Sequence, residues 1–134
     1  MVVGYGPVGR TVHQLLGECG VSTVVVEQNM ETVSQLQTQG HTAIYGDATR
    51  REILEAAGLG TAKYLIITMP QVAITSAILH TAGSMESRAR ILCRAGYLHD
   101  REVLEEAGAE IIRSDEAESA TALAKAVLQE PKMP

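Results

Sequence analysis

Short apolar runs rich in β-branched residues alternate along the chain with longer segments whose apolar residues recur every three or four positions. The short runs predict strands and the longer segments predict amphipathic helices. The predicted strands are Met1–Val3, Ser22–Glu27, Thr42–Tyr45, Tyr64–Thr68, Arg90–Arg94 and Glu110–Ile112. Helices are expected to begin near Pro7, Met30, Arg50, Gln71, Leu98 and Asp115. This alternation of strand and helix is typical of a parallel sheet.

A glycine falls where each of several predicted helices should end, the position that favours a left-handed backbone. These glycines are Gly20, Gly40, Gly58, Gly83 and Gly108. Together with loops of only a few residues, they favour a single α/β domain over residues 1–134. We expect a Rossmann-like, doubly wound sheet of six parallel strands in the order 3-2-1-4-5-6, with helices on both faces.

Two segments suggest that the domain has neighbours. Only Met1–Val3 precedes the first glycine, whereas strands commonly have five or six residues, so we expect the chain to be a piece of a longer polypeptide. The predicted helix Gln71–Gly83 is apolar around most of its circumference. One face should meet the sheet, and the remainder predicts a subunit or domain interface; the alternative is an ordinary helix with a few exposed isoleucines.

Composition narrows the classes of protein. A chain of 134 residues can bury one core but cannot join a cofactor domain to a separate substrate domain. The net charge of −5 includes no basic block, which argues against a nucleic-acid partner. Apolar runs such as Val24–Val26 are far too short to cross a bilayer, and no export signal is evident. Cys19 and Cys93 are expected to be reduced, buried thiols.

The first predicted strand leads into a candidate phosphate-binding turn. Gly4, Gly6 and Gly9 form the pattern G-x-G-x-x-G, which favours a tight turn, close approach of a phosphate and close packing of the helix, respectively. Proline is tolerated at the start of this helix, whose dipole would favour an anion. The predicted phosphate site therefore spans residues 4–9, and its remaining members are Tyr5, Pro7 and Val8. Glycine can also serve such a turn without any ligand.

A carboxylate is predicted to recognise the sugar. Glu27 lies at the end of the second predicted strand, 18 residues beyond Gly9, near the spacing expected of a ribose-binding acid. Its charge would repel a 2′-phosphate, so NAD or another adenine nucleotide is favoured over NADP. Gln28 and Asn29 follow it and are included in the predicted site. The alternative is a solvated loop carboxylate.

Three further strand ends complete the predicted site. Asp47 and Ala48 follow the third strand, where Asp47 could accept a hydrogen bond from adenine. Alternatively, Asp47 or Thr49 could simply cap the next helix. Thr68 and Met69 end the fourth strand. Arg94 ends the fifth, where its cation could reach a phosphate or pair with Glu27 or Asp47.

The combined motifs resemble the N-terminal RCK domains, also called TrkA-N or KTN domains, which regulate potassium channels and transporters. The matching segments are VVGYGPVGR, VVVEQN, YGDATRREILEAAG, KYLIITMP, ILCRA and LEEAGAEIIRSDE, in family order over nearly the whole chain. The likeness is greatest to the cytosolic domains of Kef-type cation/proton antiporters.

This resemblance implies a dimeric regulatory module that binds AMP or NAD(H) and is attached to, or associated with, a potassium or monovalent-cation/proton transporter. It implies a cytoplasmic position at the inner face of the plasma membrane. By position, the three glycines would hold phosphate, Glu27 the ribose, and Asp47 with Ala48 the adenine region. Many members have arginine where this chain has Pro7, which makes ATP a less expected ligand.

The residues favour binding over catalysis. None of His13, His41, His80 and His99 pairs in sequence with an acid, serine or cysteine in a catalytic arrangement, and their spacing suggests no metal site. We therefore expect a regulatory module with no catalytic residue and no metal. Two alternatives stay open: the Rossmann domain of an NAD-dependent oxidoreductase without its catalytic part, and a structural subunit without a ligand.

Overall fold

The computed structural model describes residues 1–131, so the last three residues of the predicted domain, 132–134, lie outside the described part. A parallel sheet has the order β3-β2-β1-β4-β5-β6. Its strands are β1 (Val2–Val3), β2 (Val24–Glu27), β3 (Thr42–Tyr45), β4 (Tyr64–Ile67), β5 (Arg90–Ala95) and β6 (Ile111–Ser114). The predicted fold class and strand order are confirmed, and every strand lies within two residues of its expected bounds.

Helices follow the strands as expected. The α-helices are α1 (Pro7–Glu18), α2 (Met30–Thr38), α3 (Arg51–Ala56), α4 (Val72–Gly83), α5 (Arg101–Glu106) and α6 (Asp115–Gln129). There are also two short 3₁₀ turns: η1 (Leu59–Thr61) lies between α3 and β4, and η2 (Leu98–Asp100) lies between β5 and α5. The helix predicted to begin at Leu98 is thus η2 continued directly by α5. None of these helices, in residues 1–131, is both long and apolar enough to cross a bilayer.

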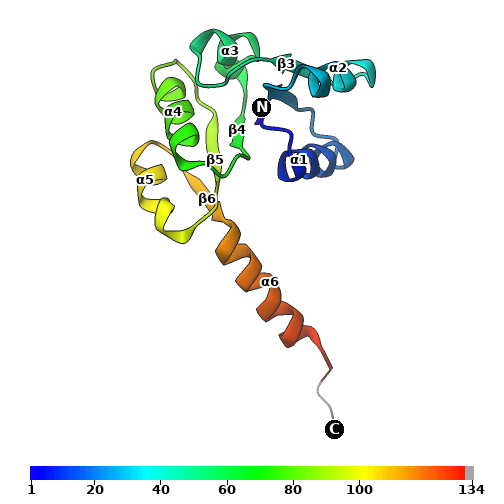
Figure 1. The fold of residues 1–134 in the computed structure, drawn as a ribbon, viewed down its shortest axis with the longest axis vertical. Helices are drawn as coiled ribbons and strands as arrows, with labels where there is room; N and C mark the ends of the chain where they lie inside the picture. The colour runs from blue at the N-terminus through cyan, green and yellow to red at the C-terminus, as the bar shows by residue number, and fades with distance from the viewer. Residues whose placement is uncertain (132–134) are drawn as a thin grey trace.

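The helices lie on both faces of the sheet (Figure 1). On one face, α3, α4 and α5 bury Leu54, Leu79 and Leu104 against the strands in the larger apolar core. On the other, α2 packs Val33 and Leu36 against β2 and β3 in a smaller core. Because every pair of neighbouring strands is parallel, their carboxyl ends meet at one edge of the sheet, where the predicted site residues lie.

Glycine ends four of the predicted helices with a left-handed backbone. The φ angles are positive at Gly20, Gly40, Gly58 and Gly108. α4 also ends at Gly83 as predicted, but the left-handed backbone expected there is wrong, because Gly83 is helical and the C-cap is Ser84 in a right-handed conformation. The Ser84 amide donates to the carbonyls of His80 and Thr81, so this helix ends without a left-handed residue.

The cysteines are both free, but only one is buried. Burial raises the pKa of the Cys93 thiol to about 12, which keeps it protonated and unreactive. The prediction that Cys19 is buried is wrong. Cys19 follows the last residue of α1 as its C-cap, and the end of that helix lies at the surface.

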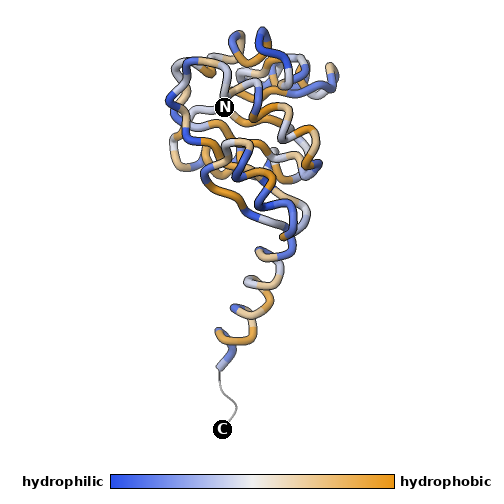
Figure 2. The backbone as a smooth tube through the Cα atoms, turned by 90° about the vertical axis from the view of Figure 1, so that its left-hand side faces the viewer, coloured by the Kyte–Doolittle hydropathy of each residue, from blue (hydrophilic) through white to orange (hydrophobic). Residues whose placement is uncertain are grey.

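The last helix projects from the rest of the domain (Figure 1). No residue of α6 is buried, and the tube in Figure 2 shows apolar positions along its exposed length. By contrast, α4 buries Thr75, Ile78, Leu79 and Ala82. The partner surface predicted on α4 remains a prediction.

Candidate functional site

Two glycines of the motif have structural reasons to lack a side chain. Gly4 directly follows β1 with φ of 95°, and a Cβ there would lie 2.7 Å from the Thr68 hydroxyl. A Cβ on Gly9 would lie 2.0 Å from the carbonyl oxygen of Gly4, so only glycine lets α1 pack this closely against the turn. The predicted roles of these glycines in the turn and in helix packing are therefore confirmed.

Gly6 has a different environment. A Cβ added there would meet no atom within 4 Å, because the residue is exposed. The helix α1 begins at Pro7, as predicted, and among residues 1–131 no acceptor pairs with the amides of Val8 and Gly9. Free amides at a helix N-terminus, beside an open glycine, form a surface suited to an anion.

The side chain of Thr68 stabilises the glycine turn by hydrogen bonding. Its hydroxyl is buried and donates to the carbonyl of Val3 at 2.8 Å, and it lies 3.3 Å from the carbonyl oxygen of Gly4. Met69 packs beside it against Gly4. The end of β4 thus fixes the conformation of the turn that follows β1, its neighbour in the sheet.

The carboxylate of Glu27 is held at the edge of this turn. One oxygen accepts the amide N–H of Tyr5 at 3.1 Å, and the other accepts the amide N–H of Asn29 at 2.8 Å. A carboxylate has about four acceptor positions, so two remain for hydroxyl donors. The side chain of Asn29 caps α2 by accepting the Thr32 amide at 3.1 Å.

Asp47 organises the loop after β3. Its Oδ1 accepts the amide of Thr49 at 2.9 Å and the hydroxyl of Thr49 at 2.8 Å. These hydrogen bonds, the backbone one first, hold the pKa of Asp47 below its ordinary value. Neither Asp47 nor Thr49 caps α3, because the N-cap is Arg50 and makes no side-chain cap bond. The Gln28 side chain and the charge of Arg50 lower the pKa of Asp47 further.

These groups surround a small cavity of about 120 Å³ at the carboxyl ends of β1, β2 and β3. Its lining includes Gly4, Glu27, Asp47, Ala48, Met69 and Ile74. An open hollow of about 650 Å³ adjoins it and shares Gln28, Gly46 and Asp47. Sequence reasoning missed Ile74, which α4 brings to the cavity, and Gly46, whose only signal was its place directly after a strand.

Arg94 does not face this cavity. Its Nε and Nη2 donate to the two carboxylate oxygens of Asp115 at 2.9 and 2.8 Å, and Nη1 donates to the carbonyl of Thr68 at 3.1 Å. The predicted ion pair with Glu27 or Asp47 is therefore wrong. β5 pairs with β6, so the nearest carboxylate is the one that begins α6.

The family model of the TrkA-N domain matches residues 1–115. The chain belongs to the TrkA-N domain family. Over 120 residues it is 32% identical to YbaL of Escherichia coli (strain K12), a protein provisionally named as a cation/proton antiporter. That alignment covers 90% of this chain and 22% of YbaL, so the chain spans about a fifth of this relative.

Solved structures agree with this membership. The crystal structure of the TrkA-N domain of the E. coli inner membrane protein YbaL is 31% identical, with a TM-score of 0.88, and the match covers 96% of this chain and 94% of that one. The Kef C-terminal domain of Shewanella denitrificans, in an AMP-bound form, is 24% identical with a TM-score of 0.80 and coverages of 96% and 80%. The GsuK channel bound to NAD is 23% identical, with a TM-score of 0.75 and coverages of 83% and 20%. The last two likenesses establish the fold alone.

Proposed function

We propose that this TrkA-N domain is a regulatory adenine-nucleotide-binding module of a potassium or monovalent-cation/proton transport protein. One observation carries the proposal: Glu27 is fixed by the Tyr5 and Asn29 amides beside the open amides at the start of α1. A sugar and a phosphate in one molecule would satisfy both groups together.

The two ends of such a ligand would find different partners. The phosphate lies over Gly6, where its oxygens accept the amides of Val8 and Gly9. The ribose hydroxyls donate to the free acceptor positions of Glu27. The cavity of about 120 Å³ is below the 300–1,000 Å³ typical of whole-ligand pockets, so the base occupies the joined hollow beside Asp47.

AMP and NAD(H) are the proposed ligands. A 2′-phosphate would meet the Glu27 carboxylate, which disfavours NADP. The Kef domain with AMP and the GsuK channel with NAD support this choice by fold. Pro7 supplies no cation for outer phosphates, which makes ATP a weaker candidate.

The module acts by binding and not by catalysis in this proposal. Nucleotide orders the loops after β1, β2 and β3 and shifts an equilibrium between two states of the protein by its difference in affinity for them. The transport protein, in the same chain or associated with it, would detect that shift. YbaL, an inner membrane protein, supports a position at the inner face of the plasma membrane. We propose a homodimer as the functional unit.

Calorimetric titration with AMP, NAD, NADH, NADP and ATP tests the binding site. We expect AMP or NAD(H) to bind, and Glu27→Ala to weaken that binding about ten- to hundredfold, the cost of losing hydrogen bonds to a charged group. Glu31→Ala is the matched control, since Glu31 is exposed in the first turn of α2 and lines none of these hollows. Tighter binding of NADP than of NAD, or unchanged affinity of Glu27→Ala, would contradict the proposal.

A further inference from the structure

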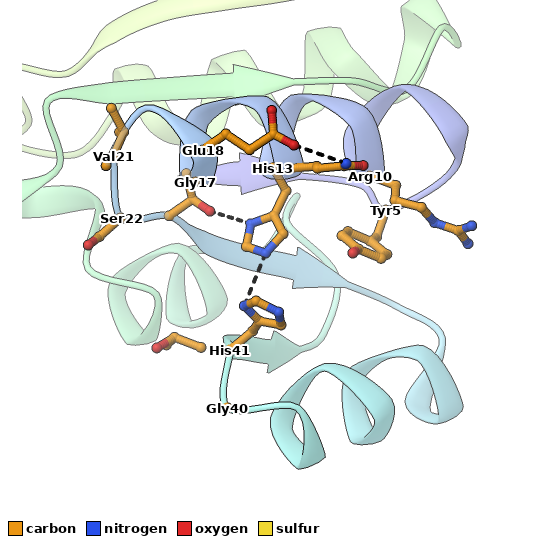
Figure 3. Close-up of a pocket in the computed structure, with 13 residues that line it drawn as sticks. Tyr5, Arg10, His13, Gly17, Glu18, Val21, Ser22, Gly40 and His41 are labelled. Carbon is orange, nitrogen blue, oxygen red and sulfur yellow. Dashed lines mark hydrogen bonds between the residues drawn. The ribbon is translucent and has the colours of Figure 1, made fainter.

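Another hollow lies beside α1 and the amino ends of β2 and β3, and it meets the predicted phosphate site only at Tyr5. It has a volume of about 790 Å³, and its lining includes His13, Glu18, Thr23 and His41 (Figure 3). Thr23 precedes β2 and His41 precedes β3, whereas Glu27 and Asp47 follow the carboxyl ends of the same strands. The acidic groups proposed to bind nucleotide therefore lie at the other ends of the strands from Thr23 and His41.

Two imidazole rings meet in this hollow. His13 Nε2 lies 3.3 Å from His41 Nδ1, with the ring centroids 4.8 Å apart and the ring planes at 81°. Two nitrogens bound to one tetrahedral zinc at about 2.0–2.1 Å would lie roughly 3.3–3.4 Å apart. The two nitrogens now share a hydrogen bond at this same separation, so a metal ion would replace the shared proton once both rings turn their lone pairs toward it.

Two neighbouring side chains fix the orientation of the His13 ring. Its Nδ1 is hydrogen-bonded to the Thr23 hydroxyl. The Tyr5 ring packs against the imidazole in a T-shaped arrangement, with the two ring centroids 5.8 Å apart. A hydroxyl can accept as well as donate. With Nδ1–H donating to Thr23, Nε2 presents its lone pair toward His41. A metal-bound histidine is ordinarily fixed by such a partner on its other nitrogen.

The surrounding charges permit a cation. Gln14 Nε2 donates to Glu18 Oε1 at 3.2 Å, which places an acidic side chain in the same hollow. The Arg10 guanidinium lies over the Tyr5 ring at 5.8 Å and points away from the two histidines (Figure 3). In residues 1–131 no three His, Cys, Asp or Glu side chains form a metal group, so water would fill the remaining coordination positions.

We propose that His13 Nε2 and His41 Nδ1 form a two-histidine site for a divalent transition metal ion of the zinc, nickel and copper class, which imidazole ligands suit. The metal would join the middle of α1 to the connection between α2 and β3. This proposal departs from the expectation drawn from histidine spacing, because folding brings together residues 28 positions apart.

Zinc chloride and nickel chloride, added separately to tag-free protein, are the probes. The readouts are the thermal midpoint and calorimetric titration at neutral pH. At ten times Kd we expect the midpoint to rise by about 4 °C. His41→Gln should abolish this rise, and because His41 is exposed, its replacement should leave the fold intact. His80→Gln, at an exposed position on α4, is the matched control and should keep the full rise.

A second variant tests the geometry. Thr23→Val keeps the shape of the side chain but removes the hydroxyl that orients His13, and should weaken metal affinity about tenfold or more. An equal rise in His41→Gln and the unmodified chain would overturn the proposal, because the metal would then bind elsewhere. The absence of any rise with both metals at millimolar concentration would overturn it as well.

Discussion

At the turn after β1, the same residue type meets opposite constraints. A Cβ on Gly9 would lie 2.0 Å from the Gly4 carbonyl oxygen, while a Cβ on Gly6 would meet nothing within 4 Å. Packing within the protein therefore requires glycine at position 9. Gly6, by contrast, leaves open a surface that the protein does not fill, as expected if a phosphate approaches the backbone there.

Substitution by alanine should separate these two requirements. We expect Gly9→Ala to lower the free energy of unfolding by about 1–3 kcal/mol, the usual cost of overpacking, with a fall in the thermal midpoint. Gly6→Ala should leave that midpoint nearly unchanged but weaken AMP binding, since its methyl group occupies the phosphate position. Thermal unfolding and calorimetry on both variants make the check. Equal destabilisation by the two substitutions would contradict the assignment.

Sequence could predict the residues of this site whose role is local. The glycine triplet and the strand-end position of Glu27 are visible in spacing alone, and the structure places Glu27 at the edge of the turn. Ile74 was not predictable, because α4 reaches the cavity from a segment after β4. The contact of His13 with His41 likewise depends on α1 and the start of β3 lying side by side.

At the scale of elements, the closest ion pair between the sheet and α6 is that of Arg94 with Asp115. Arg94 on β5 holds Asp115, the first residue of α6, through both carboxylate oxygens. Its third donor reaches the Thr68 carbonyl at the end of β4. Thr68 in turn supports the glycine turn through its hydroxyl. A short chain of contacts therefore connects the base of α6 with the predicted phosphate site.

This ion pair predicts a pH dependence of stability. The hydrogen bonds from Arg94 lower the pKa of Asp115 in the folded protein, so its contribution is present above the unfolded pKa near 4 and is lost as pH falls through the folded pKa. We expect Asp115→Asn to lower the thermal midpoint at pH 7 by a few degrees, about 1 kcal/mol for a half-exposed pair. The difference from the unmodified chain should shrink as pH falls below about 4.

Glu118→Gln is the matched control for that measurement. Its pair with Arg113 is longer, at 3.7 Å, and both side chains are more than half exposed. It should leave the thermal midpoint unchanged at either pH. A difference between Asp115→Asn and the unmodified chain that persists at low pH would show that the substitution acts through something other than this carboxylate.

Element positions were largely predictable, because strands and helices carry distinct periodicities. The bounds of β3 agree fully with prediction, and α1, α2 and α6 begin at the expected residues. α4 ends at Gly83 as predicted, but the left-handed backbone expected there is absent, since Ser84 satisfies the terminal carbonyls of that helix. The partner of Arg94 also needed the strand register, which periodicity does not provide.

At the scale of the whole molecule, α6 is an amphipathic helix that buries none of its residues against the rest of residues 1–131. Its apolar residues recur at the spacing of one helical face, and all are exposed: Ala120, Leu123, Ala124, Val127 and Leu128. The most exposed, Leu128, keeps 83% of its surface accessible. Helices of this kind ordinarily bury such a stripe. The sequence predicted an interface on α4, but this projecting helix exposes far more apolar surface.

The sheet offers a complementary surface on the face that carries α2. Ile66, Leu92 and Ile111 lie in register across β4, β5 and β6 on the same side as Val2 and Val25. These three side chains are only half-buried, whereas Val2 and Val25 are fully buried. Half of this face is thus covered and half is left partly open. A helix from a second copy would complete it.

We therefore expect α6 to mediate the proposed homodimer, and sedimentation velocity over a range of concentrations to show a dimer. Leu123→Ser combined with Val127→Ser should shift the protein to the monomer, because burying two such side chains contributes about 3–6 kcal/mol. Lys125→Ser, on the other side of the helix, should leave the dimer intact. A monomeric unmodified chain at high concentration would contradict the dimer. A double variant that still dimerises would move the interface away from α6, and the face of α4 would then be the next surface to substitute.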